Sequence, residues 1–284
     1  MSEKYREITV KSNGKTFSGW KHGSVDGIPI LALHGWLDNA NSFRFLPLNF
    51  DRFLFIAIDL RGHGRSSHGA STYNIWDYIP DLVGILDSFD FDRVIILGHS
   101  MGSGIASILA ACFPERVLSL WLLEGLGTEP DRLIQKERIR LAVKRLNDLD
   151  PKRKPIYPDF DSAVSARVNY SNDSISRKSF EKIAERGLMS VPGGLTWTSD
   201  PYLTLPSMVR FNEVQVRNFL SEIKSPISLA IASNGIFQDS ELLNNRIKVC
   251  RNIRVKKFNG GHHFHLEASR FDIWDWLCLD LEIK

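Results

Sequence analysis

A short turn with two glycines, set between an apolar run and a helix-like segment, is the feature that most constrains the fold of this 284-residue chain. The turn Gly98-His99-Ser100-Met101-Gly102 follows apolar residues 94–97 and opens a segment of small and apolar residues that continues to residue 113. A serine at such a strand-to-helix turn adopts a cramped backbone, and glycines two positions before and after it remove side chains that would clash. The turn therefore predicts a strand that passes directly into a helix, with the Ser100 hydroxyl presented at the end of the strand.

Short apolar runs recur on both sides of this turn, as is typical of strands buried on both faces. They lie at residues 28–33, 53–58, 94–97 and 117–123, and the sheet pattern resumes at 227–232 and 253–258. Helix-like segments at 75–89 and 102–113 separate several of them, so strand and helix alternate as in a parallel sheet. Alternating residues around Asn13-Gly14 predict an opening antiparallel hairpin over 7–20. The chain is therefore predicted to be an α/β protein with a mostly parallel eight-stranded sheet and helices on both faces.

This alternation stops between residues 128 and 219. Helix-compatible segments such as 131–146 and 176–188 are interrupted there by proline and glycine clusters. An insertion on the loop side of a parallel sheet lies over the crevice where ligands bind. We therefore expect a core domain of residues 1–127 and 220–284, with a helical cap, or lid, at 128–219.

Composition and the N-terminal sequence bear on the partners and the cellular location of the protein. Lys and Arg number 36 against 33 Asp and Glu, and a net charge of +3 does not indicate a nucleic-acid partner. The charged N-terminus lacks the apolar run of a secretory signal, and no stretch reaches the ~18 apolar residues of a membrane span. The 3 cysteines lack the spacing of a zinc site or disulfide framework. These features favour a cytoplasmic protein without membrane insertion, and they leave the oligomeric state open.

Ser100 is the predicted nucleophile. The helix that begins after it supplies a positive dipole and free amide groups, so the Met101 amide is placed to stabilise an oxyanion. A serine hydroxyl becomes an effective nucleophile when a histidine accepts its proton and a carboxylate fixes the tautomer of that histidine. The rest of the sequence must therefore supply a base and an acid.

Three further motifs resemble those of the α/β-hydrolase superfamily, and the resemblance covers nearly the whole chain. His34-Gly35-Trp36 follows the apolar run 28–33, residues 59–66 fit the pattern Asp-x-Arg-Gly-x-Gly-x-Ser, and residues 114–117 read Pro-Glu-Arg-Val. The resemblance implies the α/β-hydrolase fold with an inserted helical lid. It also implies that the Trp36 amide is the second oxyanion donor beside Met101, that residues 59–66 are architectural, and that His34 is a structural hydrogen-bonding residue.

Three histidines near the end of the chain are candidates for the base. The segment Gly260-Gly261-His262-His263-Phe264-His265 follows the last predicted strand, where the superfamily keeps its base. The match to Gly-x-His motifs favours His262, with His263 and His265 as alternatives. A metal site built on these histidines is disfavoured because their spacing shows no carboxylate shell. We therefore predict neither a metal nor a cofactor.

The acid departs from the usual pattern. Most members of the superfamily place it in a Gly-x-x-Asp turn after the strand that follows the lid, but here Gly235 occupies that slot and Asp239 comes four residues later. Glu124 instead follows the run 117–123, the acid position that the chain shares with haloalkane dehalogenases. A buried glutamate without a function would be costly to desolvate. We therefore expect Glu124 to be the acid, with Asp239, or a purely structural Glu124, as alternatives.

Two motifs resemble the serine hydrolase-like group of the superfamily: Leu-Leu-Glu-Gly-Leu-Gly at 122–127 and Gly-Gly-His-His-x-His-Leu-Glu at 260–267. A serine at position 100 argues against dehalogenase or epoxide hydrolase chemistry, which needs a carboxylate nucleophile. The resemblance implies cleavage of a small carboxylic ester or thioester through an acyl-Ser100 intermediate. Perhydrolase or carbon–carbon hydrolase chemistry and a non-catalytic ligand-binding protein are the alternatives. The expected substrate-binding residues are Trp36, His99, Trp197 and Tyr202.

Overall fold

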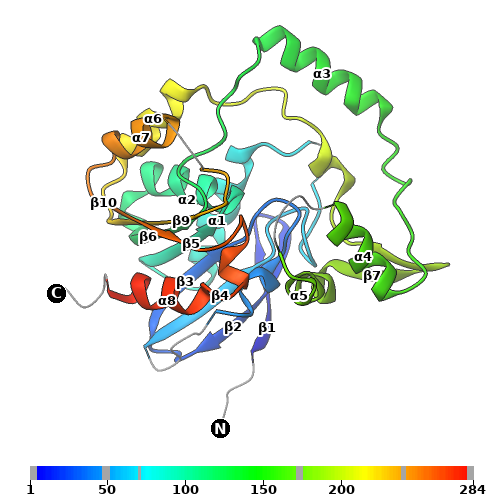
Figure 1. Ribbon diagram of the computed structural model, residues 1–284, viewed down its shortest axis with the longest axis horizontal. Helices are drawn as coiled ribbons and strands as arrows, with labels where there is room; N and C mark the ends of the chain where they lie inside the picture. Colours follow the sequence, from blue (N-terminus) through cyan, green and yellow to red (C-terminus); the bar gives the residue numbers. More distant parts are fainter. Residues whose placement is uncertain (1–4, 47–51, 70–71, 171–174, 238–240, 280–284) are drawn as a thin grey trace.

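A single eight-stranded sheet forms the centre of the molecule. The computed structural model describes residues 5–46, 52–69, 72–170, 175–237 and 241–279 (Figure 1). The strand order is β1-β2-β4-β3-β5-β6-β9-β10. The strands are β1 (Arg6–Ser12), β2 (Lys15–Gly23), β3 (Ile28–Leu33), β4 (Phe53–Ile58), β5 (Val94–His99), β6 (Val117–Leu123), β9 (Ile227–Ala232) and β10 (Ile253–Phe258). Pairs β1·β2 and β2·β4 are antiparallel and the other neighbours are parallel, so the predicted mostly parallel α/β sheet is confirmed.

The opening hairpin forms at the predicted turn. Asn13 and Gly14 both have positive φ, 48° and 72°, the backbone that a tight two-residue hairpin turn requires. The register pairs Ser12 with Lys15 and continues to Arg6 opposite Lys21. The long hairpin then joins the parallel part of the sheet through the pairing of β2 with β4.

Apolar residues on the central strands alternate between two hydrophobic layers. On β6, Leu120 and Leu122 pack on one side and Trp121 and Leu123 on the other. The first side is covered by α1 (Tyr78–Ser88), α2 (Met101–Cys112), α6 (Glu213–Glu222) and α7 (Glu241–Val249), and the second by α8 (Arg270–Cys278) (Figure 1). Because both faces are covered, the strands are nearly continuous apolar runs. Among the described helices, none is both long enough and apolar enough to span a membrane.

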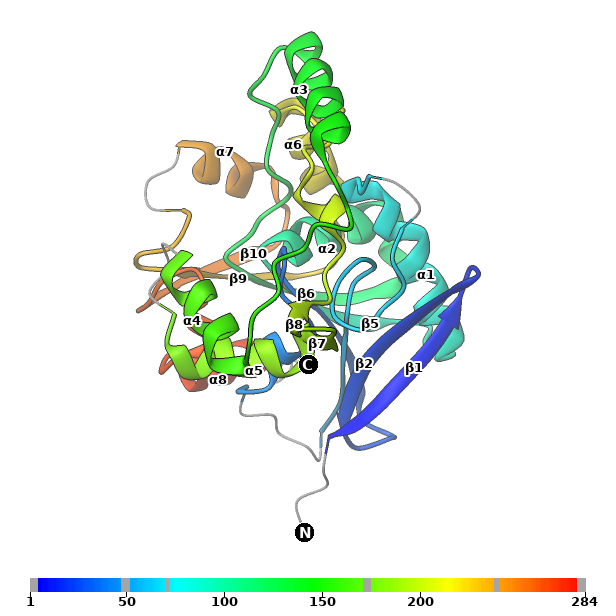
Figure 2. The ribbon, with the colours of Figure 1, turned by 90° about the vertical axis from the view of Figure 1, so that its right-hand side faces the viewer.

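The segment between β6 and β9 is an insertion with several elements of its own. It holds α3 (Gln135–Asp148), α4 (Phe160–Tyr170), α5 (Arg177–Gly187), β7 (Leu188–Val191), β8 (Gly194–Trp197) and a short 3-10 turn, η4 (Pro201–Thr204). Helix α3 stands apart from the sheet in both views (Figures 1 and 2). The mainly helical prediction omitted the β7–β8 hairpin. The predicted cap boundary at residue 219 also falls inside α6, which packs on α2 of the core.

A buried ion network fastens the α5 end of this insertion to the core. The Arg186 Nε donates to both carboxylate oxygens of Asp59, at 2.9 and 2.8 Å, and its Nη1 donates to Glu7 at 3.0 and 2.7 Å. Asp59 also accepts the amides of Ala40 and Arg65, both at 2.8 Å. The turn that begins at Asp59 is therefore architectural, as the sequence pattern predicts.

Candidate active site

Ser100 lies in a strained turn between β5 and α2. Its backbone angles are φ 52° and ψ −113°, in a region that residues with a side chain rarely occupy. A Cβ atom on Gly102 would lie 2.0 Å from the Leu33 carbonyl oxygen, so the turn can pack against β3 only with glycine there. The Ser100 amide also donates to the Leu123 carbonyl at 3.0 Å. These contacts hold the turn at the carboxyl ends of the central strands.

His262 is the histidine that the structure brings to Ser100. It lies in the loop after β10, and its Nε2 is 2.9 Å from the Ser100 Oγ. The backbone of His262 is tied down separately, because the Nε2 of His99 donates to its carbonyl oxygen at 3.0 Å. The neighbouring His263 points to a different partner, Asp38, at 3.2 Å. The third candidate, His265, is fully buried with its ring against His99.

Glu124 is positioned by backbone amides from β9 and the loop after it. It directly follows β6, is fully buried and has a positive φ of 49°. Its Oε1 accepts the Ala232 amide at 2.6 Å and its Oε2 accepts the Ile236 amide at 2.7 Å. The same Oε2 lies 3.5 Å from the His262 Nδ1, at the outer limit of a hydrogen bond. Ser100, His262 and Glu124 therefore form one connected series of side chains.

Gly235 explains why the acid stands on β6. A Cβ atom on Gly235 would lie 2.0 Å from the Glu124 Oε2, so the carboxylate would have to leave its position to make room for it. The Glu124 carboxylate thus fills the space in front of the position where the superfamily usually carries its acid, and glycine is the residue that leaves room for it. The alternative acid Asp239 lies outside the described residues.

The two predicted oxyanion donors lie at the start of α2 and in the loop after β3. Met101 is the first residue of α2, where a helix amide has no partner within its own helix. Trp36 follows β3, and its indole nitrogen donates to the Leu203 carbonyl in η4 at 2.9 Å. The Trp36 side chain is nevertheless 52% exposed. The Trp36 indole therefore connects the loop after β3 with the inserted segment, and about half of its side chain is open to solvent.

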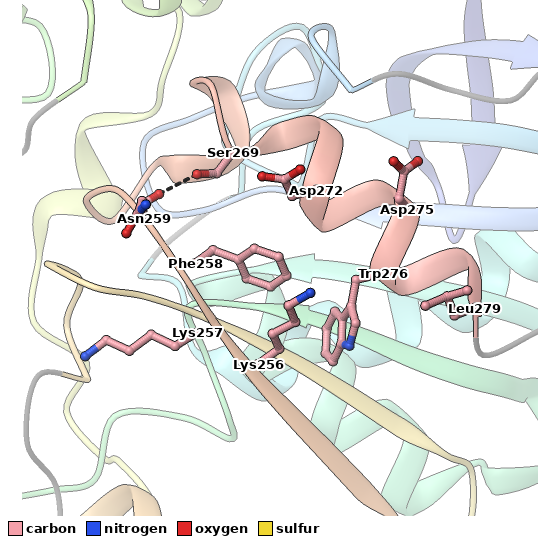
Figure 3. Close-up of a pocket in the computed structure, with 9 residues that line it drawn as sticks. All are labelled: Lys256, Lys257, Phe258, Asn259, Ser269, Asp272, Asp275, Trp276 and Leu279. Atoms are coloured by element: carbon pink, nitrogen blue, oxygen red, sulfur yellow. Dashed lines mark hydrogen bonds between the residues drawn. The ribbon is translucent and has the colours of Figure 1, made fainter.

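The other predicted pocket residues lie in different surroundings. His99 is fully buried beneath the histidine loop, so its side chain has no surface to offer a substrate and the expected substrate contact is wrong. Trp197 packs in a cluster of the insertion with Phe180 and Ile183, and Tyr202 lies in η4. A separate hollow of about 450 Å³ lies between β10 and α8 (Figure 3). Lys256, Asp272 and Trp276 are among the nine residues that line it, and none of the nine is a predicted site residue.

His34 has the structural role that the resemblance implies. It is fully buried, its Nδ1 donates to the Gly35 carbonyl at 2.8 Å, and its Nε2 accepts the Leu60 amide at 2.9 Å. Both nitrogens of the neutral ring therefore make a hydrogen bond, one as donor and one as acceptor. Burial lowers the pKa of His34 to about 4.

A second polar cluster beside the triad was missed by sequence reasoning. The Asp38 Oδ2 accepts from the His263 Nε2 and from the Ser42 Oγ, both at 3.2 Å, and lies 3.7 Å from the His99 Nδ1. Burial acts to raise the pKa of Asp38, but the adjacent His263 outweighs it and holds that pKa well below its usual range. The spacing of the histidines along the chain shows no carboxylate shell, but the fold places the Asp38 carboxylate beside them. No spacing rule signals it, because Asp38 is distant from His263 in the sequence.

Comparison with known proteins places this geometry in a family. The family described as the alpha/beta hydrolase fold matches residues 28–162. The chain is 30% identical over 272 residues to a serine hydrolase-like protein of Danio rerio, covering 90% of this chain and 83% of that protein. It is 32% identical over 259 residues to a serine hydrolase-like protein of Dictyostelium discoideum, covering 84% and 71%.

A solved structure agrees over the full length. A hypothetical protein from Pseudomonas aeruginosa PAO1 superposes with a TM-score of 0.91 at 33% identity, over 98% of this chain and 99% of that one. The similarity therefore includes the inserted segment as well as the sheet and the turn that carries Ser100. The chain belongs to the serine hydrolase-like family of proteins with the α/β-hydrolase fold.

Proposed function

We propose that this protein is a serine hydrolase that cleaves a small carboxylic ester or thioester through an acyl-Ser100 intermediate. The observation that carries the proposal is the 2.9 Å separation between the Ser100 Oγ and the His262 Nε2. Nucleophile and base within hydrogen-bond reach, with the base oriented by a third group, are the signature of covalent acyl transfer. Membership of the serine hydrolase-like family supports the same reaction class.

The reaction has two halves. Ser100 attacks the carbonyl carbon of the substrate while the His262 Nε2 accepts its proton, and the amides of Met101 and Trp36 donate to the oxyanion. Cleavage of the carbon–oxygen or carbon–sulfur bond releases the leaving group, which takes the proton back from His262. Water then attacks the acyl-Ser100 with His262 as base, which releases the carboxylic acid and restores the serine.

Glu124 has a stabilising role in this scheme. Its carboxylate stabilises the imidazolium that forms on His262 and holds the Nδ1 proton on the side away from Ser100. The two amides that bind its oxygens restrict its rotation. The separation of 3.5 Å to the His262 Nδ1 shortens when the histidine becomes charged, because charge-assisted bonds are about 2.7–2.9 Å long.

Trp36 is the best-supported substrate contact. Its indole is held by Leu203, its ring is half-exposed, and its backbone is the proposed oxyanion donor. An acyl group bound at Ser100 would therefore pack against this ring. Tyr202 precedes Leu203 in η4, so it stays a candidate for the same pocket. Trp197 shapes the insertion rather than the acyl pocket, since it packs with Phe180 and Ile183.

A fluorophosphonate probe tests the nucleophile directly. Native protein is expected to be labelled, and Ser100→Ala is expected to lose labelling, because the probe forms a covalent bond with an activated serine. Ser221→Ala is the matched control, because Ser221 is a half-exposed serine on α6, and this variant should label like the wild type. Labelling of Ser100→Ala at wild-type level would remove Ser100 from this role.

Substrate profiling tests the finer assignment. Turnover of p-nitrophenyl esters and of acyl-coenzyme A thioesters of two to sixteen carbons is expected to favour the short acyl chains. A preference for the longest chains would contradict the small substrate. Labelling by the probe without turnover of any of them would favour another triad chemistry, and a complete lack of labelling would favour the non-catalytic binding protein.

A further inference from the structure

We propose that Asp38, His99 and His263 form a binding site for a divalent transition-metal ion, with Zn²⁺ as its test ion, beside the triad. The three ligand atoms are the Asp38 Oδ2, the His99 Nδ1 and the His263 Nε2, and all lie within 4.8 Å of one another. The carboxylate oxygen is 3.2 Å from the His263 nitrogen and 3.7 Å from the His99 nitrogen. Ligands at ~2.1 Å from a tetrahedral zinc ion lie roughly 3.4 Å apart, so small side-chain shifts complete the geometry.

His99 is already in the tautomer that a metal needs. Its Nε2 faces the carbonyl oxygen of His262 at 3.0 Å, and because a carbonyl only accepts, that nitrogen carries the proton. The Nδ1 of the neutral ring therefore presents a lone pair. A ligating histidine that donates its other N–H to a backbone carbonyl is the usual outer-shell arrangement of metal sites.

That lone pair has no hydrogen-bond partner among the described residues, although His99 is fully buried. It faces the Asp38 Oδ2 at 3.7 Å, so two electron-rich atoms point at each other in a buried site. A cation between them converts this repulsion into attraction from both sides. A proton on the His99 Nδ1 would do the same, and the experiment below separates the two.

Gly35 keeps the space between these two atoms open. A Cβ atom on Gly35 would lie 3.0 Å from the His99 Nδ1 and 3.1 Å from the Asp38 Oδ2. A side chain there would crowd both ligand atoms. The missing Cβ therefore provides the room that the ligand atoms require.

His263 completes the site and gives access to it. Its Nε2 now donates to Asp38, so coordination requires that proton to move to its Nδ1 or to leave for solvent. The His263 side chain is 15% exposed, whereas that of Asp38 is 2% exposed. The Ser42 Oγ, which also donates to the Asp38 Oδ2 at 3.2 Å, can keep that bond as an outer contact.

The donor set selects the class of ion. Two imidazoles and one carboxylate suit zinc and its first-row neighbours, whereas Mg²⁺ and Ca²⁺ prefer oxygen ligands alone. Three protein ligands leave the fourth position of a tetrahedral ion for water. We therefore expect binding of Zn²⁺ and Co²⁺ and weak or no binding of Mg²⁺.

The test measures metal binding, so its outcome does not depend on the proposed hydrolase activity. Chelator-treated full-length protein is titrated with Zn²⁺ against a chromophoric chelator and with Co²⁺ by visible absorption. One equivalent is expected to bind, with Co²⁺ bands of a four-coordinate site. Asp38→Asn and His263→Gln are each expected to raise the Kd at least tenfold, since even outer-shell losses cost ten- to a hundredfold.

Two further variants locate the ion. His68→Gln is the matched control, because His68 pairs with Asp200 at 3.6 Å and no third ligand joins them within the described part of the chain. This variant should bind zinc like the wild type. Glu124→Gln should also leave the Kd unchanged, whereas a loss there would place the ion on the triad and overturn the proposal. Unaltered binding in both Asp38→Asn and His263→Gln overturns it as well. So does a wild type that binds no ion and whose ¹⁵N spectrum shows a proton on the His99 Nδ1. Thermal melts of each variant confirm that it is folded.

Discussion

Replacing Glu124 by glutamine tests the acid assignment more sharply than any other single change. Both carboxylate oxygens accept a backbone amide, from Ala232 at 2.6 Å and from Ile236 at 2.7 Å. A glutamine has only one acceptor oxygen, so in either orientation its NH₂ group meets an N–H donor. Leaving one buried donor unsatisfied costs about 1–3 kcal/mol of folding free energy.

The same substitution affects the base. An NH₂ at the Oε2 position would face the His262 Nδ1, which lies 3.5 Å away, and would favour the tautomer with its proton toward Ser100. Loss of the correct tautomer in a serine triad lowers kcat by up to about 10⁴-fold. We expect Glu124→Gln to lower kcat for p-nitrophenyl acetate by about 10³–10⁴-fold, equivalent to about 4–5 kcal/mol of transition-state free energy, with KM little changed.

The assay needs a stability measurement beside the kinetics. Urea unfolding establishes that Glu124→Gln is folded under the conditions of the assay, and Glu185→Gln, an exposed glutamate of α5, serves as the matched control. A folded Glu124→Gln protein that keeps kcat within tenfold of the wild type would refute the assignment, and the search for the acid would return to Asp239.

Three further changes test the surroundings of the site. Gly235→Ala should lower kcat at least tenfold, because its Cβ would lie 2.0 Å from the Glu124 Oε2, and unaltered kcat would show that the carboxylate does not need this space. Arg186→Met should lower the unfolding free energy in urea by about 3–5 kcal/mol, because it leaves Asp59 buried and unpaired, and a loss below 1 kcal/mol would contradict a tight ion network. The neutral His34, whose pKa is about 4 in the folded protein against about 6.5 unfolded, contributes stability that is lost as pH falls from 6.5 to 4, up to about 3 kcal/mol. Urea unfolding of wild type and His34→Gln across this range should show the two stabilities converging at low pH, and a constant difference would exclude His34 as the source.

The sheet was predictable because its signal is local. Strands β3, β4, β6 and β9 begin and end where the apolar runs do, since strands buried on both faces carry a nearly uninterrupted apolar sequence. The β7–β8 hairpin has strands of only four residues with half-exposed side chains, so periodicity gives no signal for it. Helix α4 was missed for a related reason, because its apolar residues do not gather on one clear face.

The site residues were predictable only where a local sequence motif marks them. Ser100 sits in a turn whose two glycines stand on either side of it in the sequence, between an apolar run and a helix-like segment. Glu124 was found because Gly235 stands where an acid is usual. Asp38 had no such signal, because its partners His99 and His263 reach it through the fold. His99 was misassigned because its place beside the nucleophile suggested a pocket, while its ring lies buried under the histidine loop.

The exchange between Glu124 and Gly235 leads to a last prediction. The end of β6 supplies the carboxylate, and the loop after β9 supplies the Ile236 amide that binds it. Since a Cβ on Gly235 would lie 2.0 Å from the Glu124 Oε2, an aspartate at 235 would place its own carboxylate beside His262 once Glu124 is removed. Glycine is also the residue best suited to the φ of 49° at position 124.

The double variant Glu124→Gly with Gly235→Asp should therefore recover at least tenfold in kcat over Glu124→Gly alone. The single variant Gly235→Asp, which crowds two carboxylates into one space, should be inactive or unfolded, because like charges and overlapping atoms both oppose it. Kinetics with p-nitrophenyl acetate and urea unfolding of all three proteins provide the comparison. If the double variant is folded and no faster than Glu124→Gly, the two positions are not interchangeable, and the acid on β6 would owe its function to the backbone of that strand as well as to its carboxylate.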